Sequence, residues 1–195
     1  MNKDSDNNRM YIKVERIDRH EAERFRDIYH EAFPVEEQRP WDTMFPQGDD
    51  RHGPFFLGAY SGMSLTSPTM APVGMLTFWT FDDFVYIEHF AVDSRVRGRG
   101  IGRELFRGIA ESLHRESGLP IVLEVEPESE ENPMAARRID FYRRLGFEVI
   151  DVNYVQPPYS DGLQPVDMWI MSDSVDIDID NVTRRLYEEV YKFCS

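Results

Sequence analysis

A turn rich in glycine and arginine, set between an apolar segment and an amphipathic one, restricts the fold of this chain more than any other feature. Residues 88–102 read EHFAVDSRVRGRGIG, with glycines at positions 98, 100 and 102. Apolar residues then recur at helical spacing over Gly102–Ser117, and Gly118 and Pro120 end that pattern. The segment predicts a strand, a tight turn and a helix in direct succession.

This turn has the chemistry of an anion-binding site. Backbone N–H groups at a helix N-terminus are unpaired, the helix dipole favours negative charge there, and glycines let an anion approach the backbone. Arg95, Arg97, Arg99 and Arg103 concentrate positive charge at this place, and guanidinium groups suit phosphate recognition. The glycine spacing is neither that of a P-loop nor that of the dinucleotide fingerprint. The alternative is a turn that serves only the fold, with solvated arginines.

The segments before the turn alternate in the manner of strands and predict an antiparallel meander. A helical stripe over Glu21–Phe33 follows the first of them. Alternation in the last segment places Tyr86, Glu88, Phe90 and Val92 on one face and His89 on the other. The four strand-like segments are Tyr11–Glu15, Phe55–Tyr60, Val73–Phe81 and Phe84–Val92.

After the turn the pattern changes to alternating strands and helices. A helix is predicted over Met134–Leu145, with Gly146 as its C-terminal cap. Three further segments are predicted strands: Ile121–Val125, Phe147–Val155 and Val166–Met171.

The end of the chain predicts an acidic segment and an amphipathic helix, residues 173–195, appended to a domain of residues 1–172. Val182, Leu186, Val190 and Phe193 form the apolar stripe, with Asp180 or Asn181 as the cap. Packing on its own domain is favoured over an interface with a partner, and a homodimer stays open.

Composition excludes several classes of function. A net charge of −14 argues against nucleic-acid binding and agrees with a cationic substrate, although acidity also serves solubility. No segment is apolar enough for a membrane span, so we expect a cytoplasmic protein that does not act at a membrane. The single cysteine, Cys194, excludes an internal disulfide, and the five histidines show no paired spacing, so we expect no metal.

Two motifs together resemble the acetyl-CoA signature of the GNAT superfamily of N-acetyltransferases. The first is Arg97-x-x-Gly100-x-Gly102 after a strand that ends in Phe-Ala-Val, and the second is IDFYRRLGF over residues 139–147. The resemblance implies an α/β (α+β) fold with a central mixed, mostly antiparallel sheet of six to seven strands, flanked by helices and followed by an extra C-terminal helix. It also implies acetyl-CoA as cosubstrate, held by ten residues: Phe90, Ala91, Val92, Arg97, Gly98, Arg99, Gly100, Ile101, Gly102 and Arg103.

The resemblance further implies catalytic residues. Tyr142 matches the tyrosine that family members commonly place near the CoA sulfur as general acid, although it also lies on an apolar stripe and could be only a packed aromatic. Glu88 matches the strand glutamate of polyamine-type members, and Glu124 matches that of ribosomal-protein N-terminal acetyltransferases. Either carboxylate could act as general base when partly desolvated, and we favour Glu88.

The leading hypothesis is transfer of acetyl from acetyl-CoA to a primary amine of a small molecule or peptide by direct attack. The alternative is an acyl-CoA-binding sensor or interaction module without catalysis. The acceptor is set by three segments without a decisive motif: Val35–Gly53, Ser61–Pro72 and Gln156–Pro165.

Overall fold

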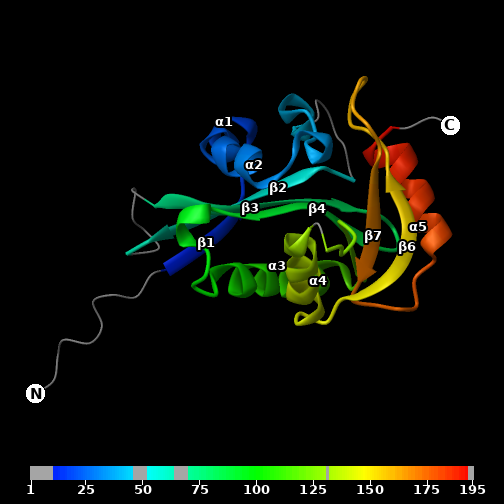
Figure 1. The fold of residues 1–195 in the computed structure, drawn as a ribbon. Coiled ribbons are helices and arrows are strands. Elements are labelled where there is room, and N and C mark those ends of the chain that lie inside the picture. Colours follow the sequence, from blue (N-terminus) through cyan, green and yellow to red (C-terminus); the bar gives the residue numbers. More distant parts are fainter. Residues whose placement is uncertain (1–10, 46–51, 64–69, 131, 193–195) are drawn as a thin grey trace, which may run out of the picture.

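The computed structural model describes residues 11–45, 52–63, 70–130 and 132–192. Its seven strands form one sheet in the order β1-β2-β3-β4-β5-β7-β6 (Figure 1). The expected mixed, mostly antiparallel sheet flanked by helices is therefore confirmed. The strands are β1 Tyr11–Arg16, β2 Phe55–Gly62, β3 Ala71–Thr80, β4 Val85–Val92, β5 Ile121–Val125, β6 Glu148–Gln156 and β7 Val166–Ser172.

Helices cover both faces of the sheet (Figure 1). On one face lie α3 (Ile101–Ser117) and α4 (Pro133–Arg143). On the other lie α1 (Arg19–Ala22), η1 (Glu23–Phe25) and α2 (Arg26–Ala32), followed by the 3-10 turns η2 (Val35–Glu37) and η3 (Trp41–Met44). The chain ends in α5 (Ile179–Arg185) and the π turn η5 (Leu186–Val190), which pack beside β6 and β7. None of the described helices has the length and apolar character needed to cross a membrane.

The sheet opens between its two parallel strands. β4 and β5 pair only through Val85, Tyr86 and Ile87 with Ile121, Val122 and Leu123, whereas all other neighbours pair antiparallel. Beyond that point the C-terminal halves of β4 and β5 separate. The first residues past the paired part are Glu88 on one strand and Glu124 on the other.

A β-bulge at Glu88 overturns the expected faces of β4. Thr77 pairs with His89 and Phe78 with Ile87, so Glu88 is the extra residue in the register. Ile87 and Phe90 both pack with the cluster under α3, while Tyr86 belongs to the cluster on the opposite face. The prediction that Tyr86, Glu88, Phe90 and Val92 share a face was wrong, because an extra residue resets the two-residue period. His89 and Glu88 are also not on opposite faces, since His89 Nδ1 lies 3.9 Å from Glu88 Oε2.

Two further expectations need correction at the chain's helices. The predicted single helix over Glu21–Phe33 is three short pieces that begin at Arg19, where the Asp18 carboxylate accepts the N–H of Glu21 at 2.9 Å. The cap of the terminal helix is Asp178, which accepts the N–H of Asn181, rather than Asp180 or Asn181. The terminal helix does pack on its own domain, through Val182, Leu186 and Val190, while Phe193 and Cys194 lie outside the described residues.

Candidate functional site

A cavity of about 530 Å³ occupies the opening between β4 and β5. Its walls come from the C-terminal half of β4, the turn before α3, the end of β5 and one side of α4, with Phe33 and Glu37 from the N-terminal segment and Tyr159 from the loop before β7. Glu88, Glu124 and Tyr142, the three catalytic residues predicted from the sequence, all line it. The structure thus brings together residues that are up to 54 positions apart in the chain.

The glycine turn forms one end of this cavity. Gly98 and Gly100 adopt φ values of +78° and +79°, a left-handed backbone that side chains other than glycine rarely adopt. Apart from the glycine and its chain neighbours, no described heavy atom lies within 4 Å of where a Cβ would stand on either residue, so the space beside the backbone is open. Gly100 is the N-cap residue of α3, and no described side chain caps the N-terminal N–H groups of this helix. These donors are free to bind an anion.

Arginines surround the turn from two elements. Arg97 donates from Nε to Val92 O at 2.8 Å, which fixes the side chain beside the turn, and Arg103 lies on the first turn of α3. Arg137 and Arg144, from α4 and its C-terminal cap, line the cavity from the other side. Within the described part of the chain no carboxylate pairs with Arg97, Arg103 or Arg137. This end of the cavity therefore carries unpaired positive charge.

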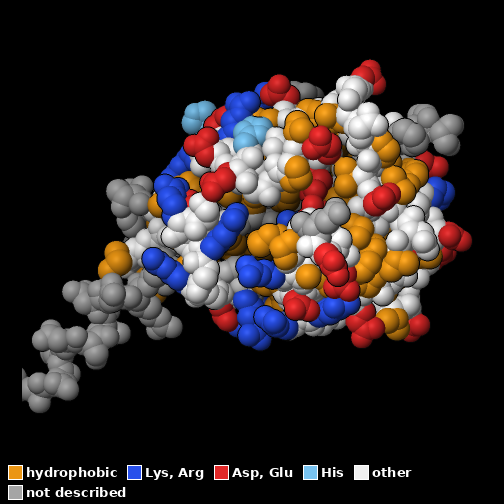
Figure 2. Space-filling view, viewed as in Figure 1, with side chains coloured by type: hydrophobic (Ala, Val, Ile, Leu, Met, Phe, Trp, Pro, Cys, Tyr) orange, Lys and Arg blue, Asp and Glu red, His pale blue; other side chains and the backbone are white. Residues whose placement is uncertain are grey.

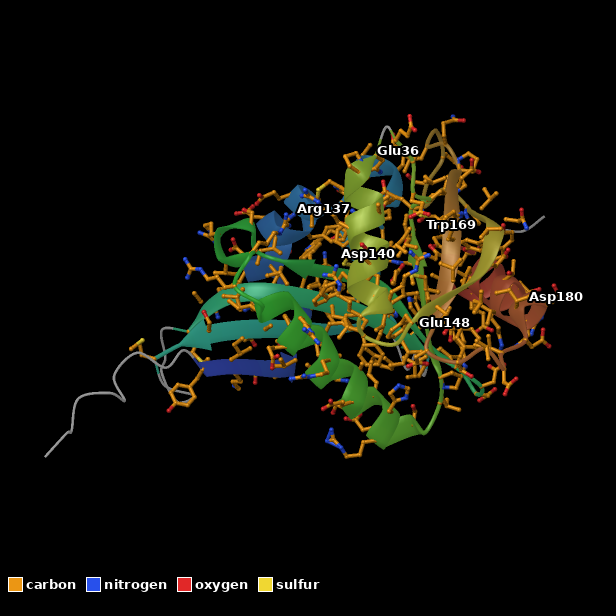
Figure 3. All side chains as sticks on the ribbon, turned by 60° about the horizontal axis from the view of Figure 1, so that its bottom comes forward. Glu36, Arg137, Asp140, Glu148, Trp169 and Asp180 are labelled. Atoms are coloured by element: carbon orange, nitrogen blue, oxygen red, sulfur yellow. The ribbon has the colours of Figure 1, made fainter. Side chains whose placement is uncertain are left out.

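The surface view agrees with this distribution of charge. Figure 2 is drawn in the same view as Figure 1. It shows Lys and Arg side chains gathered below its centre, in the region where Figure 1 places α3 and α4. Figure 3 shows Arg137 on α4, one turn away from Asp140. The sequence analysis missed the α4 arginines because a helical pattern identifies apolar positions and not the direction of the polar ones. The glycine turn that these arginines face is about forty residues away in the chain.

Most residues predicted to hold the cofactor line the cavity. They are Phe90, Ala91, Val92, Arg97, Gly98, Gly100, Gly102 and Arg103. Arg99 is exposed and is not part of the wall, while the side chain of Ile101 packs into the core. Only the backbone of Ile101 is therefore available at the turn.

Tyr142 stands at the boundary between the cavity and the core. The centroid of its ring lies 5.2 Å from that of Phe106 and 5.1 Å from that of Phe141, and the residue also lines the cavity. Burial raises the pKa of the Tyr142 phenol to about 12, and the charge of Arg138 opposes this shift only in part. The phenol is protonated at neutral pH and can donate a proton.

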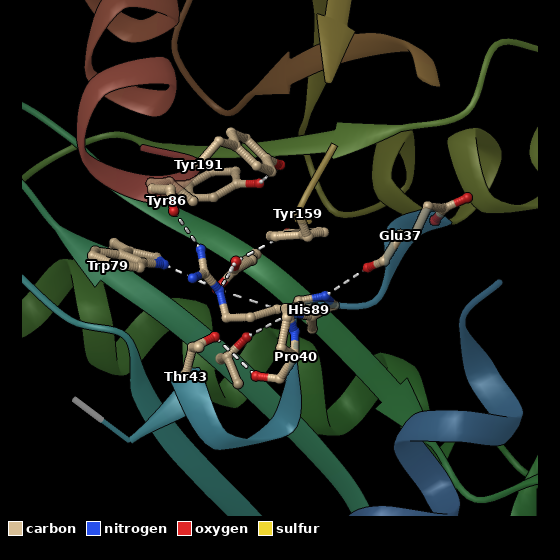
Figure 4. A network of polar contacts seen from close by, with 12 residues as sticks. Glu37, Pro40, Thr43, Trp79, Tyr86, His89, Tyr159 and Tyr191 are labelled. Atoms are coloured by element: carbon tan, nitrogen blue, oxygen red, sulfur yellow. Dashed lines mark hydrogen bonds and ion pairs between the residues drawn. The ribbon is translucent and has the colours of Figure 1, made fainter. Parts of the chain in front are cut away.

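The Glu88 carboxylate accepts hydrogen bonds from three side chains, two of which, Trp79 and Tyr159, are labelled in Figure 4. Its Oε1 accepts from Arg39 Nε at 2.6 Å and from the Tyr159 hydroxyl at 2.9 Å, and its Oε2 accepts from Trp79 Nε1 at 2.9 Å. Burial raises the pKa of Glu88, but the charge of Arg39 and these hydrogen bonds outweigh burial, so the pKa lies below its ordinary value. A carboxylate whose pKa is lowered and whose oxygens accept three hydrogen bonds is a weak proton acceptor.

Arg39 makes this ion pair part of the framework. Its side chain is 7% exposed, and one terminal nitrogen donates to Val190 O at 2.6 Å while Nε binds Glu88. The guanidinium also lies 5.3 Å from the Trp79 ring and 5.0 Å from the Tyr159 ring. One side chain thus joins the N-terminal segment, the bulge of β4, the 157–165 loop and the C-terminal turn.

Glu124 has the opposite electrostatic setting. The Tyr191 hydroxyl donates to its Oε2 at 2.7 Å, whereas its buried Oε1 accepts no hydrogen bond from a described residue. Burial raises the pKa of Glu124 to about 7, although the nearby phenols of Tyr154, Tyr191 and Tyr86 lower it. No cation pairs with Glu124 among the described residues. Near neutral pH this carboxylate can both accept and release a proton.

Sequence reasoning missed Tyr191, which comes from the C-terminal turn. Its hydroxyl lies 3.1 Å from that of Tyr86 and donates to Glu124, and its ring lies 4.9 Å from Tyr159 (Figure 4). Tyr191 follows the buried Val190 directly, and the apolar stripe of the terminal helix was its only signal. Sequence reasoning also missed Glu37, because the segment around it shows no apolar period. No group of three or more potential metal ligands occurs in the described ranges.

Solved structures with a similar fold include acetyltransferases. A protein of the GNAT family from Bacteroides thetaiotaomicron has a TM-score of 0.71 and 31% identity, covering 93% of this chain and 99% of that chain. Arabidopsis thaliana Naa50, solved in complex with the bisubstrate analogue CoA-Ac-MVNAL, has a TM-score of 0.56 and 20% identity, covering 84% of this chain and 98% of that chain. The second likeness shows the fold alone.

Sequence comparison also finds acetyltransferases among the relatives of this chain. YjbC of Bacillus subtilis (strain 168), assigned as an acetyltransferase, is 32% identical over 74 residues, which are 38% of this chain and 36% of that relative. The match thus spans about a third of the length of this curated relative. The model described as the acetyltransferase (GNAT) family matches residues 22–147, more than half of the chain. The chain belongs to the acetyltransferase (GNAT) family.

Proposed function

We propose that this protein transfers the acetyl group of acetyl-CoA to a primary amine of a small molecule or peptide. The observation that carries the proposal is one cavity with a cationic glycine turn at one end and an unpaired carboxylate of near-neutral pKa, Glu124, further in. The first suits a pyrophosphate, and the second suits removal of a proton from an ammonium group.

Open space beside Gly98 and Gly100, uncapped N–H groups of α3 and unpaired arginines fit the diphosphate of CoA. In our proposal Arg97 and Arg103 bind it from one side and Arg137 from the other. When bound, acetyl-CoA supplies the activated acyl group. Naa50, whose fold this chain resembles, was solved with a CoA-containing analogue, which agrees with a CoA ligand.

Glu124 accepts the proton of the amine and Tyr142 returns a proton to the departing sulfur. The amine nitrogen forms a bond to the thioester carbonyl carbon, the carbon–sulfur bond breaks with its electron pair on sulfur, and the Tyr142 phenol donates its proton to that thiolate. Glu124 takes one proton from the ammonium form before attack, directly or through water. The second proton, which the nitrogen loses after attack, passes through water to the Tyr142 phenolate and restores the phenol. We assign Glu88, favoured as base from the sequence, to positioning instead, because Arg39, Trp79 and Tyr159 occupy its lone pairs.

The test measures thiol release from acetyl-CoA with a panel of primary amines and peptides, beside calorimetric titration with acetyl-CoA alone. The account expects micromolar to sub-millimolar binding and amine-dependent release of CoA. Binding without release above the blank for any amine supports a non-catalytic acyl-CoA sensor. No binding at all refutes both functions.

A further inference from the structure

Glu37 is a buried residue whose carboxylate has no partner in the described part of the chain. The residue is 8% exposed, lies at the end of η2 and lines the cavity. Its backbone oxygen accepts from His89 Nε2, at 3.1 Å, but its carboxylate makes no hydrogen bond or ion pair with any described residue. An isolated buried charge is costly unless something neutralises it.

Two other carboxylates that line the cavity have cationic partners. Glu88 is paired with Arg39, and Glu126 is paired with Arg138 at 2.5 Å. Arg138 and Glu37 influence one another at longer range, but the ion pair of Arg138 is with Glu126. Among the described carboxylates that line the cavity, Glu37 and Glu124 are therefore the two without a cationic partner.

These two carboxylates have different tasks in acetyl transfer. Glu124 takes a proton from the amine that attacks, so this amine is neutral when it reacts and leaves Glu37 without a counter-charge. We infer that Glu37 binds a second cationic group of the acceptor, so that the acceptors are amines carrying another positive charge beyond the nitrogen that is acetylated. This inference rests on the proposed function of the same cavity.

Aromatic side chains in the same cavity suit an apolar linker. Phe33 and Tyr159 both line the cavity and both contact His89, with ring centroids 4.8 Å and 6.1 Å from that of His89. Burial and the charge of Arg39 lower the pKa of His89, and the charge of Glu88 opposes this shift only in part, so that the imidazole is neutral and does not compete for Glu37. Methylene groups of a diamine can lie against these rings while its ends meet Glu37 and Glu124.

The experiment compares α,ω-diamines of three to eight carbons with n-alkylamines of the same length. Each is titrated calorimetrically into the protein saturated with CoA at pH 8, where a carboxyl with a pKa of about 7, as burial gives Glu37, is ionised and the amines are still protonated. We expect at least one diamine to bind about tenfold more tightly than its monoamine, which corresponds to roughly 1.4 kcal/mol. Steady-state assays with the same pairs should show the difference in KM rather than in kcat.

Glu37→Gln keeps the shape and removes the charge, and Glu36→Gln is the matched control because Glu36 does not line the cavity. The preference for the diamine should vanish in Glu37→Gln and persist in Glu36→Gln. Equal binding of diamines and monoamines by the unmodified protein, or an undiminished preference in Glu37→Gln, overturns the inference. Because diamine binding is measured without turnover, this failure is distinct from failure of the acetyl-CoA titration, which overturns the proposed function.

Discussion

Replacement of Tyr191 by phenylalanine tests how the C-terminal turn acts on the candidate base. The variant removes only the hydroxyl that donates to Glu124 Oε2 at 2.7 Å. A hydrogen bond to a charged group contributes about 1.5–3 kcal/mol, and 1.36 kcal/mol corresponds to roughly one pKa unit. Since the bond favours the ionised carboxylate, its loss raises the pKa of Glu124 from about 7 by at least about one unit.

The consequence appears in the pH dependence of kcat. At pH 7 the ionised fraction of Glu124 falls from about one half to about one tenth, so kcat should drop about fivefold, while above pH 9 the two proteins should nearly coincide. Tyr86 and Glu88 on β4 and Tyr154 on β6 also face Glu124 and are unchanged.

Tyr187→Phe is the matched control for this measurement. Tyr187 lies on the same turn, and its hydroxyl donates to Val155 O at 2.7 Å instead of to Glu124. With one amine substrate throughout, the ionisation of the amine cancels between variants. The reasoning is refuted if the acidic limb of the pH profile of kcat stays in place in Tyr191→Phe, or if it moves equally in Tyr187→Phe.

Two further substitutions probe the turn and the framework. Gly100→Ala should lower the free energy of unfolding by about 1 kcal/mol and weaken acetyl-CoA binding, because φ is +79° there. Gly108→Ala is the control, since Gly108 lies inside α3 with open space around it, and it should not destabilise the protein. Denaturant titration measures the stability of both variants, and calorimetry measures their binding of acetyl-CoA. Glu88→Gln should cost about 3–5 kcal/mol because it leaves Arg39 buried without its counter-ion. Since the folded pKa of Glu88 is lowered, its contribution is present above the unfolded pKa near 4.5 and is lost as the pH falls through the folded pKa, so denaturation curves of the two proteins should converge in acid. Equal stability at pH 7 contradicts a paired Glu88.

The parts of the fold that depend on local chemistry could be predicted from the sequence. Gly98 and Gly100 specify the turn before α3 because its backbone needs positive φ and open space, and both requirements appear in the structure. Alternation and helical stripes located all seven strands, α3 and α4 to within a few residues.

The parts that depend on pairing between distant segments could not be predicted. The bulge at Glu88 is set by the register of β3 against β4, which an alternating pattern does not contain. Arg39 reaches Glu88 across 49 positions and Val190 across 151, and no local pattern marks a residue with such partners. For this reason the sequence indicated a Glu88 carboxylate available for catalysis, whereas in the structure this carboxylate is hydrogen-bonded to Arg39, Trp79 and Tyr159.

Glutamine at position 124 gives the most direct test of the central account, in which the glycine turn binds acetyl-CoA and Glu124 accepts the amine proton. Titration calorimetry and thiol release are measured on the same preparation of Glu124→Gln and of the unmodified protein. The account predicts an unchanged Kd for acetyl-CoA and a kcat lower by about 100-fold or more, the range of a lost general base. A Glu124→Gln protein that turns over as fast as the unmodified one contradicts the account.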